Sequence, residues 1–382
     1  MRQIARRKKQ EGAVAIMVAL MLVFLLGIAA LAIDIGNLMV ARNEAQNAAD
    51  ATALAAAGCL YQHTKCNNMT TPVPDWTDAQ TTGTTFVSSN SVQGTALKAA
   101  VVNIGYWDIT HTIDGLQASD IKPTSNDLPA VQVVIHKDGT DENKAVPAYL
   151  ASVLGINVLK VSAVATAAIA NPGKVGPGGL FPMAMPLCMY QQFWSTANNA
   201  PILDPNGPPL DSTQIETQTP GQPYVFDMGS TYHISSTCDA GQWTSFNPAT
   251  NGCTSNQSDS CIDGMLTTGN ASTMSIGDQT WIKSGTANNL FKDTNACSAA
   301  APVGQRTCEW ETVLVVDSVA SSTTGAYHTI VAFACLHILR ATKGANPYVT
   351  VQMSNDPSHC EPINASGVGP NYGAITPPRL VQ

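Results

Sequence analysis

The chain has 382 residues, 12% of them charged, and a formal net charge of −8 at neutral pH. Beyond residue 12 it carries 14 Lys+Arg, which is 19 minus five in the N-terminal tail, and 26 Asp+Glu, which is 27 minus Glu11, so this part has a net charge of −12. Such an acidic chain argues against nucleic acid and anionic lipid headgroups as general partners. Its length allows two domains beyond a membrane helix.

An apolar segment near the N-terminus predicts a membrane anchor. Residues 13–33 carry no charge and are long enough to cross a hydrocarbon core of roughly 30 Å as one helix. Basic side chains cluster just before it, at Arg2, Arg6, Arg7, Lys8 and Lys9. Because such clusters stay in the cytoplasm, we expect residues 1–12 to form a cytoplasmic tail and the rest of the chain to lie outside.

The helix is predicted to continue beyond the membrane. Residues 34–57 are rich in alanine and contain no proline, so helix propensity stays high past the apolar run. ALA at 30–32 fits a signal-peptidase site, but the apolar run is longer than the segment of 7 to 15 residues typical of a secretory signal. A retained anchor is therefore favoured over cleavage.

The order of short motifs in this region resembles a known family. A basic tail is followed by GAVAI at 12–16, the apolar run, AIDIG at 32–36 and ARNEAQNAADATALAAA at 41–57. This order is similar to the N-terminal region of TadE/TadG-like proteins of the Flp (tight adherence) pilus machinery, over roughly residues 10–60. The resemblance implies a bacterial single-pass protein of the inner membrane, with the bulk of the chain periplasmic or at the cell surface, that acts in pilus assembly or anchoring.

One feature departs from the pilin-like members of that family. They carry a glycine processing site followed five residues later by glutamate, whereas Gly12 is followed at that place by Met17. This departure from the processing motif argues against prepilin-peptidase cleavage and leaves N-terminal processing open.

Small side chains mark one face of the outer half of the helix. They recur at steps of three and four, as residues on one helix face do. The face consists of Leu38, Ala41, Ala45, Ala48, Thr52 and Ala55. We call this set the alanine stripe. It allows close approach of another helix or sheet, which is either the chain's own next unit or, in the hypothesis we favour functionally, the helices of pilin-like or other Tad partners.

Residues 58–171 are predicted to form a small α+β unit, in an order that TadE/TadG-like proteins share. The predicted elements are a loop at 67–93, a helix at 94–105, strands at 107–113 and 130–136, a helix at 144–155 ended by Gly155, and a strand at 158–170.

Residues 171–179 (NPGKVGPGG) contain two prolines and four glycines, so they predict a domain boundary that forms neither helix nor sheet. The part at 172–382 has short, turn-rich segments, which predict a mainly-β sandwich or barrel. The expected strands lie at 180–190, 223–228, 231–235, 242–246, 274–285, 312–317, 329–341 and 348–353. The later ones resemble the C-terminal β domain of many TadE/TadG-like proteins.

All ten cysteines follow residue 58, and an even count in an oxidising compartment predicts up to five disulfides. Cys59 and Cys66 are the obvious local pair because no other cysteine lies near them in the sequence. A zinc site formed with His63 would have only three ligands, so we favour the disulfide.

No motif indicates catalysis, a cofactor or a metal. Asp317 begins a sequence similar to a von Willebrand A metal motif, but Val319 takes the place of an oxygen ligand. Asp204 to Asp211 lacks the ligand spacing of a calcium loop, and Glu309 and Glu311 are expected on a solvated strand face.

The sequence thus predicts an α+β protein with a single transmembrane helix that continues as a long pilin-like helix, a small α+β unit and a disulfide-rich mainly-β domain. Its segments are 1–12, 13–33, 34–57, 58–171 and 172–382. We expect a non-enzymatic, membrane-anchored structural or assembly component of a Tad (Flp) pilus or its secretion machinery. The alternative is an anchored surface or periplasmic adhesion module that binds glycan or matrix, for which an aromatic-lined groove would be the sign.

Overall fold

The structure is a computed structural model of the chain. It describes residues 11–382 except 62–65, 67–73, 122, 125, 140–141, 197, 199, 205–219, 230–241, 248–258, 284–286, 318–325, 357–358 and 360.

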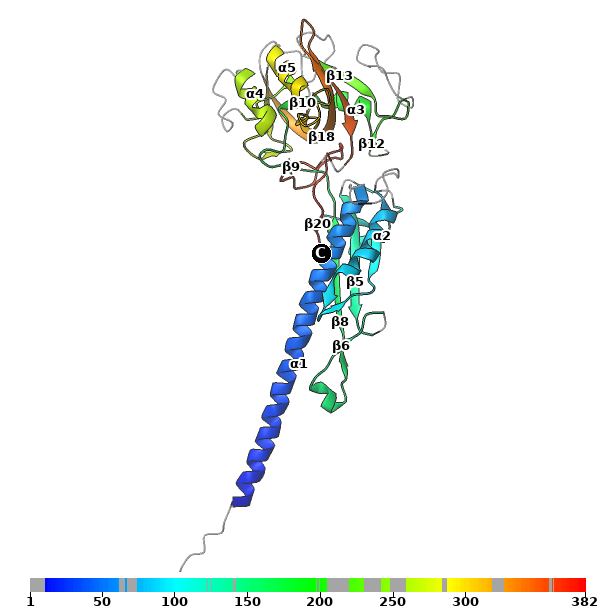
Figure 1. The fold of residues 1–382 in the computed structure, drawn as a ribbon, viewed down its shortest axis with the longest axis vertical. Helices are drawn as coiled ribbons and strands as arrows, with labels where there is room; N and C mark the ends of the chain where they lie inside the picture. Colours follow the sequence, from blue (N-terminus) through cyan, green and yellow to red (C-terminus); the bar gives the residue numbers. More distant parts are fainter. Residues whose placement is uncertain are drawn as a thin grey trace, which may run out of the picture.

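One long helix forms the axis of the molecule (Figure 1). Helix α1 runs without interruption over Glu11–Ala57, 47 residues, and is followed by the short helix η1 at Gly58–Tyr61. At 1.5 Å per residue its length is about 70 Å. The predicted continuous helix across residues 13–57 is confirmed. It is uninterrupted because the segment contains no proline and stays rich in residues of high helix propensity.

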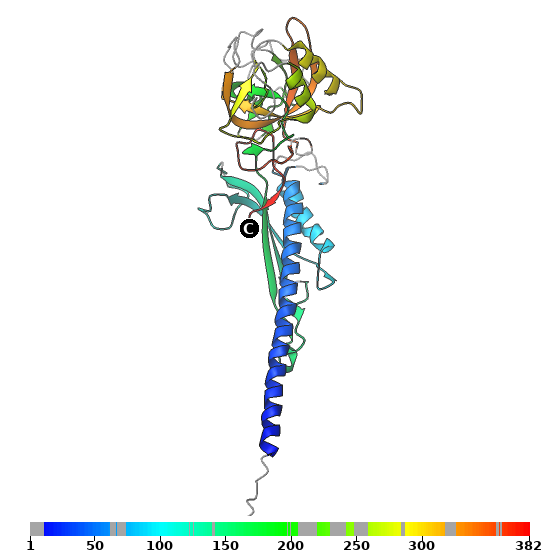
Figure 2. The ribbon, with the colours of Figure 1, turned by 90° about the vertical axis from the view of Figure 1, so that its left-hand side faces the viewer.

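A five-stranded antiparallel sheet packs on the outer half of α1 (Figures 1 and 2). Its order is β20-β8-β5-β3-β4, with β20 at Arg379–Leu380, β8 at Val161–Ala168, β5 at Asp127–Lys137, β3 at Val101–Asp108 and β4 at Leu116–Gln117. The strand predicted at 130–136 is confirmed within β5, and the one predicted at 158–170 is confirmed for the residues of β8, while residues 158–159 pair elsewhere. The edge strand β20 comes from the C-terminus of the chain, which therefore returns to the sheet beside α1.

Helix α2, at Trp76–Phe86, corrects the predicted loop at 67–93. Its threonine-rich sequence carries little helical signal, but Asp75 caps it by accepting a hydrogen bond from the backbone N–H of Asp78 at 3.0 Å. A Cβ on Gly83 would lie 3.3 Å from the Cβ of Ala56, so the lack of a side chain lets α2 lie close against α1. Tertiary packing here overrides weak local propensity.

The helix predicted at 94–105 is also wrong. The chain instead forms the short hairpin of β1 (Ser91–Val92) and β2 (Thr95–Ala96), after the turn η2 (Val87–Ser89), and then enters β3. β-branched residues that can alternate between a buried and an exposed face favour the strand.

The strand predicted at 107–113 ends early, at Asp108. Its carboxylate accepts hydrogen bonds from the hydroxyl and backbone N–H groups of Thr110 and Thr112 and from the N–H of Ile113. These hydrogen bonds, the Thr110 hydroxyl first, hold the pKa of Asp108 well below its ordinary value. They close a turn that replaces the expected strand.

The helix predicted at 144–155 is a hairpin with a short turn of helix at its tip. β6 (Val146–Pro147) pairs with β7 (Val158–Leu159), and η3 (Ala151–Leu154) lies between them. Gly155, with φ of 85°, ends η3 as predicted.

The part of the chain after residue 171 contains a closed ring of strands. β18 (Ala326–Thr342) pairs with β17 (Trp310–Val316), β17 with β10 (Met183–Pro186), and β10 with β14 (Gln242–Trp243). Residues 243–246 then bond to β16 (Gln279–Ile282), which pairs back with β18. Of the two predicted architectures, the barrel describes this ring.

Side chains on both faces of the ring are buried. Alternate residues point inward, and Leu314, Val316, Ile330, Phe333 and Phe246 pack together there. On the outer face the side chains of the ring pack with α3 (Leu187–Phe193) and α5 (Asn288–Cys297). The sheet also continues beyond the ring, because β19 (Tyr348–Ser354) pairs with β18 and β13 (Val225–Gly229) pairs with β19. The remaining elements are α4 (Asp259–Thr268) and the short pairs β9 (Lys174–Val175) with β15 (Met274–Ser275) and β11 (Trp194–Ser195) with β12 (Ala200–Pro201). The strand predicted at 231–235 lies outside the described residues.

Two antiparallel segments connect the ring to the α1 unit. Residues 171–176 lie beside 364–369, and Gly173 and Lys174 both donate backbone N–H groups to the carbonyl oxygen of Ser366. A Cβ on Gly173 would meet the carbonyl oxygen of Val368 at 2.6 Å. The predicted boundary thus contains a short strand, β9, and paired backbone, because its glycines permit a close crossing. The division into five segments stays a prediction.

Disulfides join Cys59 to Cys66 and Cys297 to Cys308. Cys188, Cys261 and Cys335 are also disulfide-bonded, and there is no free cysteine among the described residues. The first bridge lies at the end of α1, and the second joins the end of α5 to the segment before β17.

Candidate functional site: helix α1 and the sheet that holds it

The N-terminal half of α1 exposes its apolar side chains on every side. From Val14 to Ile33 only Ala30 is partly covered, and the most apolar stretch has a mean hydropathy of 3.0 with none of its surface buried in the chain. A core helix of a soluble protein would be buried, whereas this one is bare over a length that matches a bilayer. The helix is therefore long and apolar enough to cross a membrane.

The outer half of α1 is held by the chain's own sheet, and this corrects the partner-docking interpretation of the alanine stripe. Ala41, Ala45, Ala48 and Thr52 are at most 3% exposed. The three alanines pack, with Leu38 beside them, in one cluster with alternate residues of β5 and β8, among them Val133. Leu38 and Ala55, at the two ends of the stripe, are partly open. The stripe is thus occupied within the chain, as in the alternative that the sequence left open.

Polar contacts fix the same face. Gln46 donates to the carbonyl oxygen of Val164 at 2.8 Å, and Glu44 accepts the backbone N–H of Gln93 at 2.6 Å. Lys137, 4% exposed, feels the charge of Glu44, but burial has the larger effect and lowers its pKa. These contacts join α1 and the sheet into one unit.

Polar and apolar residues on the opposite face of the outer half remain open. They lie about 180° around the helix from the stripe, since each residue turns the helix by about 100°. The set, which we call the free face, is Ile35, Met39, Val40, Asn43 and Asn47. Met39 is 63% and Val40 53% exposed. This is the surface of the outer helix that another protein can reach.

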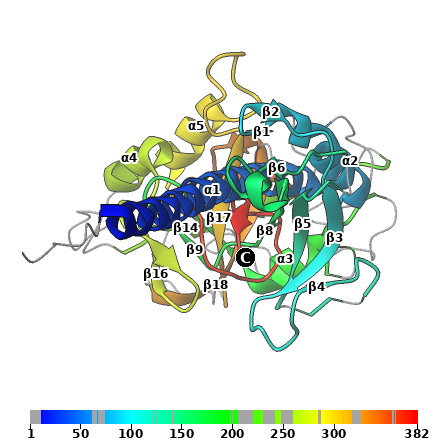
Figure 3. The same ribbon diagram turned by 90° about the horizontal axis from the view of Figure 1, so that it is seen from below.

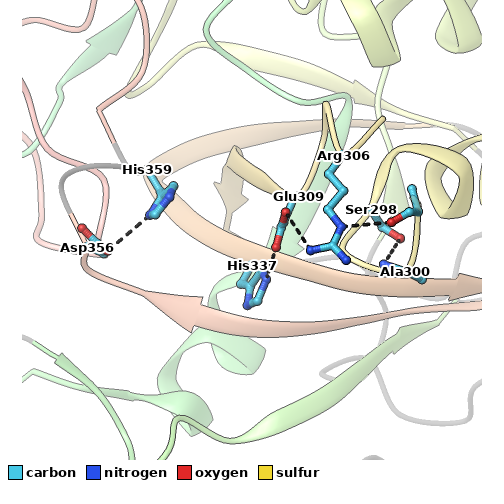
Figure 4. Close-up of polar contacts among 8 residues, drawn as sticks. Ser298, Ala300, Arg306, Glu309, His337, Asp356 and His359 are labelled. Atoms are coloured by element: carbon cyan, nitrogen blue, oxygen red, sulfur yellow. Dashed lines mark hydrogen bonds and ion pairs between the residues drawn. The ribbon is translucent and has the colours of Figure 1, made fainter. Parts of the chain in front are cut away.

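A second cluster of titratable groups lies on the ring, at β17 and β18 (Figure 4). The ring of Trp310 stacks between His337, at a centroid distance of 3.9 Å, and His359, at 4.3 Å. His337 lies 3.2 Å from a carboxylate oxygen of Glu309, and His359 lies 3.2 Å from one of Asp356. Each histidine thus has an acidic neighbour.

This cluster has the properties of a structural stack. Arg306 also approaches Glu309, at 3.9 Å, so that carboxylate already has two basic neighbours. No group of three or more His, Cys, Asp or Glu side chains that could hold a metal ion occurs among the described residues. Glu311, expected on a solvated face, is instead half-buried, and desolvation raises its pKa to about 8.

A cavity of about 440 Å³ lies at the β11–β12 hairpin. Its only aromatic lining residue is Trp194, which is 2% exposed. A glycan-binding groove presents open aromatic faces, so this cavity does not favour the adhesion alternative. Of the remaining sequence candidates, Asp317 contacts His328 at 3.7 Å, while residues 318–321 and 205–211 lie outside the described residues.

Sequence reasoning missed the role of Asp34, the first polar residue after the apolar run. Its carboxylate accepts backbone N–H groups from Tyr149, Leu150 and Ala151, and it is 3% exposed. The available signal was its position on the same helix face as the alanine stripe. A carboxylate on a face that becomes buried requires hydrogen-bond donors from another part of the chain.

Comparisons with known proteins agree with the motifs of α1. A family model described as Flp pilus-assembly TadE/G-like matches residues 12–58, and a second, described as Tad-like Flp pilus-assembly, matches residues 55–167. No curated protein and no solved structure matches the chain. The two matched regions contain α1, α2 and strands β1 to β7 with most of β8, and they end before the ring. Over residues 12–167 this chain is therefore similar to the TadE/G-like proteins of Flp pilus assembly.

Proposed function

We propose that this protein is a non-enzymatic structural component of a Tad (Flp) type pilus or its secretion machinery, anchored in the inner membrane. Residues 13–33 cross the bilayer, the basic tail is cytoplasmic, and the rest of the chain is periplasmic or at the cell surface. The observation that carries the proposal is the division of α1 into a bare apolar half and a half fixed to a folded unit. Such a helix supports a rigid unit at a set distance from the membrane.

The free face is the surface we propose for contact with pilin-like partners. Its apolar centre, Met39 and Val40, directly follows the span and continues an exposed apolar surface out of the bilayer. Asn43 and Asn47 lie further out and supply amide donors and acceptors. A partner helix that leaves the same membrane side by side with α1 would meet this face first.

The experiment is crosslinking in cells that produce Flp pili. A photoreactive residue at Met39 is expected to form adducts with a pilus component, while the same residue at Val303, 88% exposed on the distal part of the chain, forms none. Adducts at both positions or at neither would contradict docking by the free face. A periplasm-dependent reporter should be active after Gly58 and silent after Gly12, and activity at Gly12 would reverse the topology.

A further inference from the structure

The hairpin β6–η3–β7 is an uncharged projection of the α1 unit. Residues 145–159 (AVPAYLASVLGINVL) contain no charged side chain, whereas exposed lysines, Lys144 and Lys160, flank them on both sides. We call residues 145–159 the apolar hairpin. The chain beyond residue 12 is acidic overall, so an uncharged hairpin flanked only by lysines differs from the rest of it in charge.

The apolar hairpin is bound to α1 at the outer end of the apolar span. Asn37 donates to the carbonyl oxygen of Pro147 at 3.4 Å, and one turn of helix closer to the N-terminus Asp34 accepts the N–H of Tyr149 at 2.9 Å. The hairpin therefore runs along α1 toward its apolar half, as Figure 1 shows below β6. Seen from below, β6 lies next to α1 (Figure 3). Its tip lies beyond the Asp34 contacts.

The covered surface of the span locates the tip. Ala30 is the one residue between 14 and 33 that is not fully open, and it lies on the same helix face as Asp34, about 6 Å closer to the N-terminus. A span of 20 residues fills a hydrocarbon core of about 30 Å. Because Asp34 follows the span directly and binds residues 149–151, the tip lies beside the last turn of the span, at the depth where hydrocarbon meets headgroups.

Large apolar side chains of the apolar hairpin are exposed. Val153 is 84% exposed, Tyr149 60% and Ile156 51%, and Leu150 and Val158 are 38% and 52% exposed. Nothing in the fold of the described residues covers them. Contiguous exposed apolar surface of this kind marks a site of membrane or protein contact.

We propose that the apolar hairpin inserts into the outer interface of the same bilayer that α1 crosses, as a second membrane contact. The inference rests on the proposed membrane span of α1. Val153 and Ile156 enter the boundary between headgroups and acyl chains, Tyr149 lies at headgroup level as aromatic residues with a polar tip do, and Lys144 and Lys160 reach the lipid phosphates. The bilayer is favoured over a protein partner because the patch is continuous with the bare span at the same depth.

Two contacts would fix the tilt of the protein. A single helix can rotate and tilt in the bilayer, whereas a helix and a hairpin clamped to it by Asp34 define an orientation. The free face would then point in a fixed direction along the membrane.

Depth-dependent fluorescence quenching tests the inference with the full chain in phosphatidylcholine–phosphatidylglycerol vesicles. The lipids carry bromine either near the headgroup or near the bilayer centre. Three variants each add one tryptophan to the six present: Val153→Trp in the tip, Val303→Trp at an equally exposed site far from α1, and Leu22→Trp within the span. Both valines are exposed, so tryptophan needs no repacking there.

For Val153→Trp we expect added emission that headgroup-proximal bromine quenches several-fold more than in Val303→Trp, since interfacial segments bury about 5–10 Å into that boundary. Leu22→Trp should be quenched most by central bromine. Quenching of Leu22→Trp without quenching of Val153→Trp would overturn the hairpin inference and leave the anchor intact. Absence of quenching in both would overturn the membrane span and, with it, this inference.

Discussion

Replacing Ala48 with leucine should loosen α1 from its own sheet. Ala48 is 3% exposed and lies in the cluster that joins α1 to β5 and β8, so the extra carbon atoms have no free space. Overpacking of this kind costs about 1–3 kcal/mol. Asn47, the adjacent residue, is exposed on the free face, where leucine is a better helix former and should cost nothing. The pair Ala48→Leu and Asn47→Leu therefore separates packing from helix propensity.

Hydrogen exchange of the full chain in detergent micelles measures the effect locally. If the outer half of α1 opens from the sheet as a unit, a loss of about 1–3 kcal/mol raises the exchange rates of its amides by roughly 5- to 150-fold. Asn47→Leu should exchange like the wild type. Unchanged exchange in Ala48→Leu, or acceleration in Asn47→Leu instead, would refute the assignment of the two faces.

Three further predictions concern other parts of the fold. Asp34→Ala leaves the N–H groups of residues 149–151 without their acceptor, at about 1–3 kcal/mol, so these amides should exchange faster; unchanged rates would show that Asp34 does not clamp the hairpin. Because the native pKa of Glu311, about 8, lies above its ordinary value of 4.5, the native state binds the extra proton, and stability falls as pH rises between these values. In Glu311→Gln the melting temperature of the ring should lose this slope, and a slope equal to that of the wild type would contradict it. Gly173→Ala brings a Cβ within 2.6 Å of a main-chain carbonyl and should expose the connection to limited proteolysis, whereas Gly264→Ala, with open space, should not; equal cleavage of both would exclude the close crossing.

Local patterns predicted the elements whose side chains repeat with a clear period. α1 follows from an uncharged run continued by alanine, and β8 follows from small and β-branched residues in alternation. The helix predicted at 144–155 was wrong. The apolar residues of this segment recur at helical spacing, but they form an exposed hairpin. What decides there is the acceptor that Asp34 provides from more than a hundred residues away. No local pattern contains that contact.

The sequence allowed the helix face to be predicted, but not which element packs against it. The spacing of Ala41, Ala45 and Ala48 correctly placed them on one side of α1, and packing against β5 and β8 then used that side within the chain. The closure of the strands into a ring could not be predicted from the sequence either, because it depends on residues 243–246 pairing with β16. Long-range pairings of this kind carry no signal in a single sequence.

Deletion of the gene in a bacterium that produces Flp pili, followed by electron microscopy of the cells, tests the central claim most directly. The account predicts loss or severe reduction of pili. Piliation should return with the full chain and fail to return with a chain whose residues 13–33 are replaced by a cleavable secretory signal, which exports the rest without an anchor. Normal piliation in the deletion strain, or full rescue by the unanchored chain, would contradict an anchored structural component.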